Sequence, residues 1–496
     1  MAVTSLRLQR LASRLGYPRR PASSLTKIVA TIGPASEDLE PLKACVASGF
    51  EVMRLNFSHA TEEEFFRRVH NLAKCDGGHK VATLLDTRGP EVRLGGLKIC
   101  KDSGDRKAKV ALEAGSTLLL TGDAAFDGAG DATTMYVNYP GLDKVVEVGD
   151  SVLLDDGLVI LEVASADENG VTCTVTNSNA IGERKGVNIP GAPLGLPPLS
   201  AKDQADVAFG VANGINFVAA SFIGDAAGVE AVRAFVDAEV AKHPDLYPDG
   251  DKVLIVSKVE SLGALDELEG IVDASDGVMV ARGDLGVEVP IASVATWQKT
   301  IVGLCRAAGK PVIVATQMLE SMQKNPRPTR AEVADVTNAA LELADAVMLS
   351  GESANGDYPA LALKTQRDIL AAAEAWDDEL YDAGWAGVEP ALALPLAAVH
   401  AQRAAGADAI VVVEDEGGDK ARKVAQCAPD VPVVALAPSL RVAKQLNVSR
   451  GVRPHHAPDA TSLDADQAAA RAKPLLGDAA SVVVFSKNSV SLHDLP

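Results

Sequence analysis

Three ionisable residues stand at or just after the ends of neighbouring apolar segments, in a pattern that could bind a metal. Glu260 and Asp284 each follow such a segment, and Lys258 lies two positions before Glu260, so both would point to one side of a strand. Carboxylates completed by substrate oxygens are a usual coordination for Mg²⁺. A lysine beside them would offer a point charge to a phosphoryl group in transfer. The alternatives are ordinary ion pairs or, for Lys258, a Schiff-base lysine.

Polar residues also end the other apolar segments. Arg54 carries a planar guanidinium that suits a phosphate group. Four residues with side-chain oxygens and one formal charge favour a monovalent cation over Mg²⁺, and these are Asn56, Ser58, Asp86 and Thr87. Capping of the following helices is the alternative for Ser58 and Thr87. The remaining segments end in or near Ser221, Arg282, Thr316, Ser350 and Glu352.

Eight apolar segments rich in β-branched residues carry these polar ends. They are Lys27–Gly33, Val52–Phe57, Val81–Asp86, Phe217–Phe222, Val253–Lys258, Gly277–Ala281, Pro311–Thr316 and Ala346–Ser350. The gaps between them contain helix-like stretches, among them Asp38–Ala47, Glu62–Ala73, Ala226–Ala241 and Ser293–Ala308. Eight strands that alternate with helices predict an α/β fold, a (β/α)₈ TIM barrel whose active site lies at the carboxyl ends of the strands.

Two further units interrupt and follow this rhythm. Residues 94–185 are rich in Gly, Asp, Val and Thr and contain short alternating segments such as Val159–Val163, which predict an inserted all-β domain. The barrel would then comprise residues 26–93 and 186–376. From residue 393 to 496 the segments Ala409–Val413, Val433–Leu436 and Ser481–Phe485 indicate a separate C-terminal α/β domain.

Composition narrows the class of protein. The 496 residues carry a formal net charge of −20, which disfavours binding to nucleic acid. The six cysteines are far apart and suit a reducing compartment. No apolar run approaches the roughly 20 residues that span a bilayer, so we expect a soluble protein without membrane contact.

Residues 1–25 differ from the rest because they contain five arginines and no acidic residue. This composition is typical of an organelle transit peptide and also of a short basic arm that docks on an acidic body. The dispersed cysteines favour a cytoplasmic protein. A plastid or a mitochondrion is the alternative if residues 1–25 are a transit peptide.

At this point the sequence resembles the pyruvate kinase family. The resemblance rests on nine motifs that follow the family's order from about residue 26 to 370, and they are Thr26–Ser36, Arg54–His59, Leu85–Arg93, Lys185–Gly191, Ile255–Glu260, Met279–Gly286, Ala315–Ser321, Asn325–Arg330 and Met348–Glu352. It implies transfer of a phosphoryl group from phosphoenolpyruvate to ADP, with Mg²⁺ (or Mn²⁺) and K⁺ as cofactors. It also implies a homotetramer, with Arg330 in the subunit-contact region.

The resemblance assigns roles to single residues. The phosphoenolpyruvate site would consist of Arg54, Ser221, Lys258, Gly283, Asp284 and Thr316, of which Lys258, Arg54 and Thr316 would act in catalysis. The Mg²⁺ ligands would be Glu260 and Asp284. The K⁺ ligands would be Asn56, Ser58, Asp86 and Thr87. The nucleotide contacts would be Arg54, Asn56, His59 and Lys185, although His59 taken alone suggests an ordinary surface histidine.

Two positions bear on regulation. In the family a glutamate in the place of Glu91 accompanies potassium dependence, whereas a lysine there stands in for the ion. Many relatives hold a sugar phosphate with a hydroxyl-rich loop after the first strand of the C-terminal domain. Here the segment Glu414–Lys420 carries four carboxylates instead, so we expect no activation by fructose bisphosphate.

Two other functions compete with this interpretation. One is a Mg²⁺-dependent lyase or aldolase that forms a pyruvate enolate on the same barrel. The inserted β domain and the potassium ligands argue against it, because a lyase needs neither ADP nor a second cation. The other is a catalytically silent homologue that serves as a sensor or scaffold, although every transfer residue is present.

Overall fold

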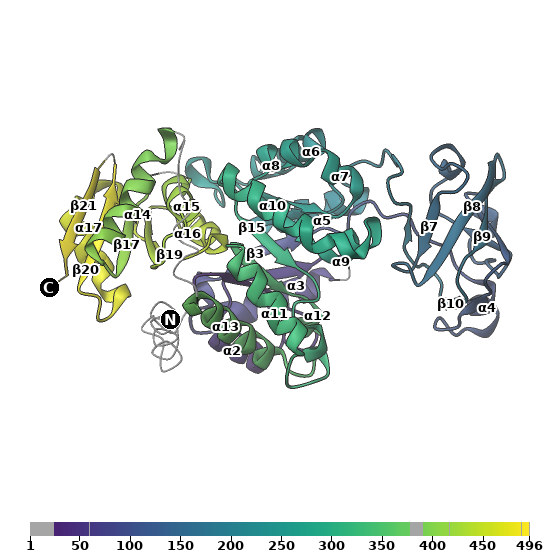
Figure 1. The fold of residues 1–496 in the computed structure, drawn as a ribbon, viewed down its shortest axis with the longest axis horizontal. Helices are drawn as coiled ribbons and strands as arrows, with labels where there is room; N and C mark the ends of the chain where they lie inside the picture. Colours follow the sequence, from purple (N-terminus) through teal and green to yellow (C-terminus); the bar gives the residue numbers. More distant parts are fainter. Residues whose placement is uncertain (1–23, 59, 377–389, 416, 488, 496) are drawn as a thin grey trace, which may run out of the picture.

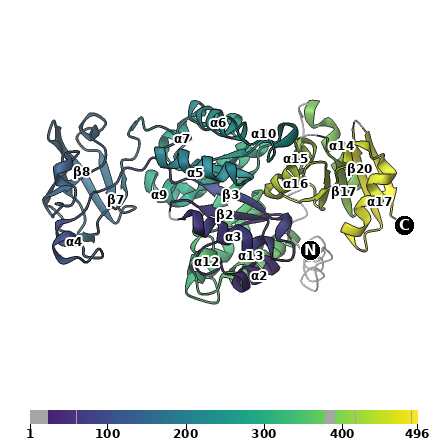
Figure 2. The same ribbon diagram turned by 180° about the vertical axis from the view of Figure 1, so that it is seen from behind.

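The computed structural model describes residues 24–58, 60–376, 390–415, 417–487 and 489–495. These residues form three bodies in a row, with an eight-stranded barrel in the middle, a strand-rich domain at one end and an α/β domain at the other (Figure 1). The view from behind shows the same order, with helices packed around the central barrel (Figure 2). Residues 1–23 of the predicted basic extension lie outside the described part.

The central sheet is a closed barrel in which all neighbouring strands are parallel, and this confirms the predicted fold class. Around the barrel the order is β1-β16-β15-β14-β13-β12-β3-β2. In chain order the strands are β1 (Lys27–Thr31), β2 (Val52–Asn56), β3 (Ala82–Asp86), β12 (Phe217–Ala220), β13 (Leu254–Val259), β14 (Gly277–Ala281), β15 (Val312–Ala315) and β16 (Ala346–Leu349).

Five barrel strands end one or two residues earlier than the sequence predicts, and for two of them the backbone shows the reason. The predicted strands Phe217–Phe222 and Pro311–Thr316 stop at Ala220 and Ala315. The reason is a left-handed backbone just beyond each end, with φ of 54° at Phe222 and 67° at Thr316. A residue in that conformation cannot continue an extended strand.

A cluster of apolar side chains fills the interior of the barrel, and the outer face of the barrel packs against the helices. The inner cluster includes Val29, Leu84, Phe217, Met279 and Ile313, all of them buried. The strands are buried on both faces, as expected of a parallel barrel. The covering helices are α2 (Leu39–Ser48), α3 (Glu62–Ala73), α5 (Ala201–Ala212), α6 (Ala226–Val240), α8 (Leu268–Ala274), α10 (Val294–Ala308), α11 (Arg330–Leu341) and α13 (Pro359–Trp376).

Helix capping excludes one alternative for two predicted site residues. The helix after β2 is capped by Thr61, whose side chain accepts from the Glu64 backbone in a capping box. The helix that precedes β12 is capped in the same way by Ser200. Ser58 and Thr87 therefore cap neither helix.

The insertion between β3 and β12 is a β-domain with its own apolar core, as the sequence predicts. Its larger sheet has the order β11-β7-β8-β9-β5-β6, and a second sheet pairs β10 with β4. The strands are β4 (Val110–Leu112), β5 (Thr117–Thr121), β6 (Thr134–Tyr136), β7 (Ser151–Leu154), β8 (Val159–Asp167), β9 (Gly170–Val175), β10 (Asn179–Ile181) and β11 (Val187–Asn188).

The C-terminal domain is a five-stranded sheet with the order β19-β18-β17-β20-β21. The strands are β17 (Ala409–Val413), β18 (Val433–Ala437), β19 (Val452–His456), β20 (Ser481–Ser486) and β21 (Ser489–Asp494), and the helices include α14 (Ala393–Ala405), α15 (Asp419–Gln426), α16 (Leu440–Gln445) and α17 (Ala465–Leu476). The sequence predicted β17, β18 and β20. It missed the edge strands β19 and β21, whose polar side chains give no apolar run.

An acidic side chain just after β17 binds the amino-terminal end of helix α15. The Glu414 side chain is fully buried and accepts the backbone N–H of Ala421, in the first turn of α15, at 2.5 Å. Burial raises the pKa of Glu414 to about 7, against the opposing effect of Arg422 and Lys420. Both cations are paired with neighbouring acids, since Lys420 Nζ lies 2.7 Å from Asp415 Oδ2 of the loop and Arg422 lies 3.0 Å from Asp419 at the start of α15.

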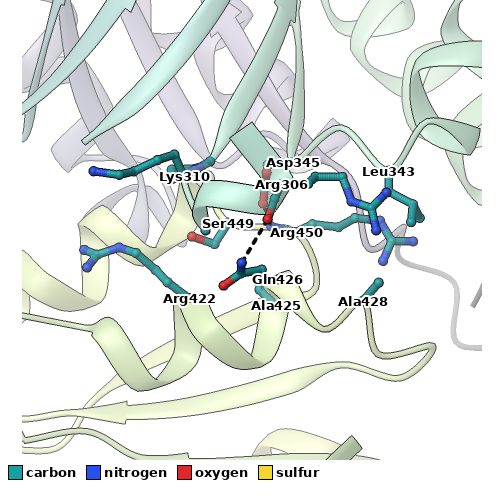
Figure 3. Close-up of a pocket in the computed structure, with 12 residues that line it drawn as sticks. Arg306, Lys310, Leu343, Asp345, Arg422, Ala425, Gln426, Ala428, Ser449 and Arg450 are labelled. Carbon is teal, nitrogen blue, oxygen red and sulfur yellow. Dashed lines mark hydrogen bonds between the residues drawn. The ribbon is translucent and has the colours of Figure 1, made fainter. Parts of the chain in front are cut away.

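The C-terminal domain is bound to the amino-terminal end of the barrel by side chains that reach backbone carbonyls. Gln426 of α15 donates to the carbonyl of Arg306 at the end of α10 at 2.9 Å (Figure 3). Asn447 donates to the Lys80 carbonyl at 2.7 Å, and Lys27 Nζ donates to the Val452 carbonyl. In the described part of the chain, no helix has the length and apolar content needed to span a membrane.

Candidate active site at the carboxyl ends of the barrel strands

A buried lysine occupies the centre of the site. Lys258 of β13 is 12% exposed, and its Nζ donates to Ser221 Oγ at 2.8 Å. The same nitrogen lies 2.8 Å from Glu260 Oε1 and 3.2 Å from Asp86 Oδ1. Burial alone would lower the pKa of Lys258, but the two carboxylates outweigh it and raise the pKa above its usual value. Lys258 is therefore a fixed positive charge.

Arg54 and Asp86 form a second ion pair beside the lysine. Arg54 Nε donates to Asp86 Oδ2 at 2.6 Å, and its Nη1 donates to Thr31 Oγ1 at 3.0 Å. Burial would raise the pKa of Asp86, but Arg54 and Lys258 lower it below its usual range. Both cations thus converge on Asp86, and the group carries a net positive charge before Glu260 is counted.

Glu260 and Asp284 have the properties of ligands for a hard cation. Glu260 is 1% exposed, and its Oε2 accepts the Phe222 backbone N–H at 2.6 Å. Its Oε1 is near Lys258 Nζ but, among the described residues, accepts no hydrogen bond of good geometry. Burial raises the pKa of Glu260 to about 7, and burial also raises the pKa of Asp284. A buried carboxylate oxygen that has an ion pair but no well-aligned hydrogen bond, beside a second carboxylate, fits a bound Mg²⁺ ion.

Thr316 lies on a strained turn next to this carboxylate pair. Its hydroxyl donates to the Ala315 carbonyl at 2.6 Å and accepts the Gly283 backbone N–H at 2.8 Å. Both Thr316 and Gln317 are left-handed, with φ of 67° and 56°. Such residues cost on the order of 1–3 kcal/mol each and persist only where their surroundings enforce them.

The residues predicted to bind a monovalent cation follow two adjacent strands. Asn56 at the end of β2 pairs in register with Asp86 at the end of β3. The Asn56 side chain accepts the Ser58 backbone N–H at 3.1 Å. Thr87 is buried, and its carbonyl accepts the Ser221 hydroxyl at 2.6 Å. The fold therefore brings all four predicted oxygen donors to one rim of the barrel, beside Ser221.

A large cleft separates the barrel from the inserted domain. Its volume is about 1120 Å³, and residues of both domains line it, including Asp156 and Lys185 on one side and Asp284 on the other. Lys185 Nζ lies 3.0 Å from Asp155 Oδ1. The predicted nucleotide contact Lys185 thus shares a cleft with the predicted metal ligand Asp284. The predicted contact His59 lies outside the described residues.

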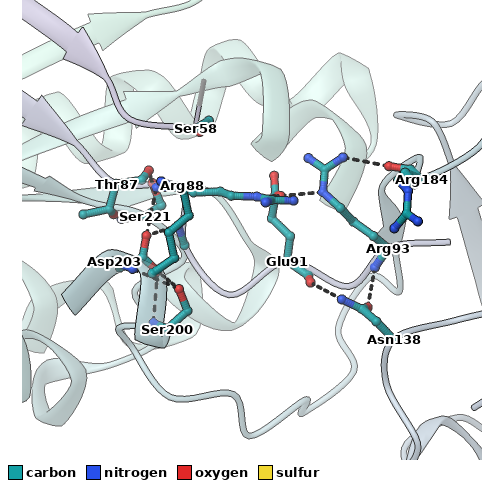
Figure 4. A network of polar contacts seen from close by, with 12 residues as sticks. Ser58, Thr87, Arg88, Glu91, Arg93, Asn138, Arg184, Ser200, Asp203 and Ser221 are labelled. Carbon is teal, nitrogen blue, oxygen red and sulfur yellow. Dashed lines mark hydrogen bonds and ion pairs between the residues drawn. The ribbon is translucent and has the colours of Figure 1, made fainter. Parts of the chain in front are cut away.

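The connection between the two domains carries a charged network that the sequence did not reveal. Glu91 Oε2 accepts from Arg88 Nε at 2.7 Å and from Arg93 Nε at 2.6 Å (Figure 4). Arg93 also donates to the Arg184 carbonyl on the returning segment at 2.9 Å. These arginines and Ser58 line a pocket of about 510 Å³. The sequence did offer one signal for this network, because Arg88, Arg93 and Arg184 stand close to the two ends of the insertion.

Comparison with known proteins gives one consistent family. The family model "Pyruvate kinase, barrel domain" matches residues 23–363, and "Pyruvate kinase, alpha/beta domain" matches residues 393–491. Pyruvate kinase PKLR of Homo sapiens is 41% identical over 447 residues, which cover 87% of this chain and 75% of that protein. The pyruvate kinase of Leishmania mexicana is 40% identical over 437 residues, with coverage of 86% and 83%.

A solved structure is similar over almost the whole chain. The pyruvate kinase from Cryptosporidium parvum has a TM-score of 0.87 and 33% sequence identity, and the alignment covers 96% of this chain and 97% of that one. The similarity therefore includes the barrel, the inserted domain and the C-terminal domain together.

The carboxylate pair predicts a loss of metal binding on neutralisation. We expect Glu260→Gln and Asp284→Asn each to weaken Mn²⁺ binding by at least about tenfold, because each removes one of the two carboxylates proposed as ligands. Electron paramagnetic resonance of free Mn²⁺ measures the affinity. Glu267→Gln, a neutral substitution of another acid that lines the cleft, is the matched control and should bind as the wild type does. Unchanged affinity in the Glu260→Gln variant would refute the assignment.

Proposed function

Because the chain belongs to the pyruvate kinase family, we propose that the carboxyl ends of its barrel strands are where the phosphoryl group of phosphoenolpyruvate moves to ADP. The reaction gives pyruvate and ATP and is the final step of glycolysis. The observation that carries this assignment is the buried Lys258 ammonium between Asp86 and Glu260, next to the Asp284 carboxyl.

The proposed roles of the residues follow the charges of the site. Phosphoenolpyruvate would bind to Arg54, Ser221, Lys258, Gly283, Asp284 and Thr316. Mg²⁺ would be held by Glu260 and Asp284, and K⁺ by Asn56, Ser58, Asp86 and Thr87. The nucleotide would be held by Arg54, Asn56, His59 and Lys185. The connection between the barrel and the inserted domain adds Arg93, whose guanidinium is oriented by Glu91, as a further candidate for contact with an anion.

Two cationic side chains and one hydroxyl would carry the chemistry. Lys258 and Arg54 are pre-oriented by Asp86, so their charges need no reorganisation when negative charge spreads over the phosphoryl oxygens. When bound, Mg²⁺ and K⁺ would supply further positive charge to the phosphoryl group and the enolate. Thr316 would orient the proton donor to the enolate carbon, by way of water. Closure of the inserted domain over the cleft would exclude bulk water.

We also propose a homotetramer for this chain. Arg330 begins α11 on the outside of the barrel and is exposed, which leaves it accessible to a second subunit.

Cytoplasmic location is proposed on the acidic composition and the dispersed cysteines.

Removal of the central lysine should abolish phosphoryl transfer. Lys258→Ala deletes a pre-organised charge, and the loss of one such contact typically costs about 100- to 1000-fold in rate. Exchange of pyruvate methyl protons with solvent should partly survive, because it depends mainly on the metal and Thr316. Both rates are measured on the same preparation. Lys242→Ala, which removes a surface lysine, is the control. A loss in ATP formation of less than about tenfold would contradict the role of Lys258.

Activity should require a monovalent cation of the size of potassium. The oxygen donors at β2 and β3 have no lysine in the place of Glu91, and the Glu91 carboxylate is paired with both Arg88 and Arg93. With tetramethylammonium as the only monovalent cation, we expect turnover to fall at least about tenfold and K⁺ to restore it. Glu91→Lys should relax the requirement, whereas Glu91→Gln, which adds no positive charge, should retain it. Full wild-type activity without K⁺ would refute the site.

Fructose bisphosphate should leave the enzyme unaffected. The amide of Ala421 that could meet a phosphate already binds the Glu414 carboxylate, and the loop cations are paired with Asp415 and Asp419. A dianion would therefore meet acids rather than donors. The measurement is the phosphoenolpyruvate saturation curve with and without the sugar. A shift toward lower phosphoenolpyruvate concentration of more than about twofold would show this expectation to be wrong.

A further inference from the structure

Arg282 makes contacts that no role proposed above uses. It is the first residue of α9 (Arg282–Glu288), directly after β14, and its side chain is 12% exposed. Its Nε donates to the Ala315 carbonyl at 3.0 Å, and its Nη2 donates to the Thr316 carbonyl at 2.5 Å. One guanidinium thus holds two consecutive carbonyls at the end of β15.

These two carbonyls flank the point at which the chain turns into the left-handed region. Thr316 is β-branched, and an L residue of this kind rarely adopts a φ of 67°. Gln317 follows with a φ of 56°. A turn of this kind persists only where its surroundings enforce it, and Arg282 provides two hydrogen bonds that do so. The direction of the Thr316 hydroxyl, which meets the Gly283 N–H, depends on this turn.

The opposite side of the guanidinium is fixed by two helices. Arg282 Nη1 donates to Asp335 Oδ1 of α11 at 2.7 Å and to Gln298 Oε1 of α10 at 3.2 Å. Asp335 lies five residues after Arg330, on the helix that we propose to meet another subunit. Arg282 therefore connects the helix layer of the barrel with the Thr316 turn.

We propose that Arg282 is a positioning residue for Thr316 and transmits the position of α11 to the protonation of the enolate. The proposal rests on the role of Thr316 given under the proposed function. Lysine could not replace it, because a single ammonium lacks the planar fork that reaches two carbonyls and a carboxylate at once.

The direct test is Arg282→Lys. We expect exchange of pyruvate methyl protons with solvent to fall about 10- to 100-fold, as a displacement near 1 Å at a reacting group does. The KM for phosphoenolpyruvate should stay within about twofold, because Arg54 and Lys258 remain. Arg233→Lys, which alters another arginine–aspartate pair of the barrel, should change neither quantity.

A double-mutant cycle separates positioning from general support of the fold. If Arg282 acts through Thr316, Arg282→Lys should lower turnover by less than about twofold in a Thr316→Ala background. Full additivity of the two losses would overturn the proposal, as would unchanged exchange in the single variant. If Arg282→Lys does not fold, Asp335→Asn decides: it keeps the shape of the pair, should lower exchange in the same direction and should show the same non-additivity with Thr316→Ala.

Failure of this proposal is distinct from failure of the proposed function. A wild-type protein that forms no ATP from phosphoenolpyruvate and ADP would refute the function. An active wild-type enzyme whose Arg282→Lys variant loses phosphoenolpyruvate affinity and proton exchange alike would refute the positioning role alone.

Discussion

Burial of the Lys258 ammonium between two carboxylates is the interaction on which the rest of the site depends. A buried charge is tolerated only when it is paired, and Lys258 lies 3.2 Å from Asp86 Oδ1 and 2.8 Å from Glu260 Oε1. Asp86 is fully satisfied because Arg54 binds its other oxygen. Glu260 is not, since its Oε1 accepts no hydrogen bond of good geometry within the described part of the chain. The lysine therefore fixes both carboxylates, and the incomplete hydrogen bonding of Glu260 leaves that carboxylate able to bind a further cation.

The closed parallel sheet explains how residues so far apart in sequence reach this group. Asp86 of β3 stands in register with Ala219 of β12, so that these two strands are direct neighbours. The whole inserted domain lies between them in sequence, yet it leaves the barrel and returns to it at one place, where Arg93 and Gly186 pair in an antiparallel bridge. A domain attached through two adjacent segments can move over the cleft without disturbing the strand pairing.

The sequence predicted the architecture better than the connections inside it. Apolar periodicity located all eight barrel strands, because a strand buried on both faces leaves a continuous apolar run. The polar strand ends then indicated the site. Periodicity carries no signal for the arginine pair around Glu91, the contact of Arg282 with Thr316, or the polar edge strand β19 (Val452–His456). Those features depend on distances between segments that only the folded chain defines.

Left-handed residues just beyond two barrel strands free polar groups that a continuing strand would use for sheet pairing. In an extended strand, the N–H of Phe222 would donate to a neighbouring strand of the sheet. Its left-handed backbone, with a φ of 54°, turns that N–H toward Glu260, which it reaches at 2.6 Å. Gly89 makes the turn possible, because a Cβ there would stand 2.7 Å from the Phe222 ring. At the end of β15 a second left-handed residue, Thr316, places its hydroxyl where it accepts the Gly283 N–H. Strand pairing ends early at both places. The turn at Phe222 directs an N–H to the Glu260 carboxylate, and the turn at Thr316 places a hydroxyl on the backbone of Gly283, next to Asp284 in the chain.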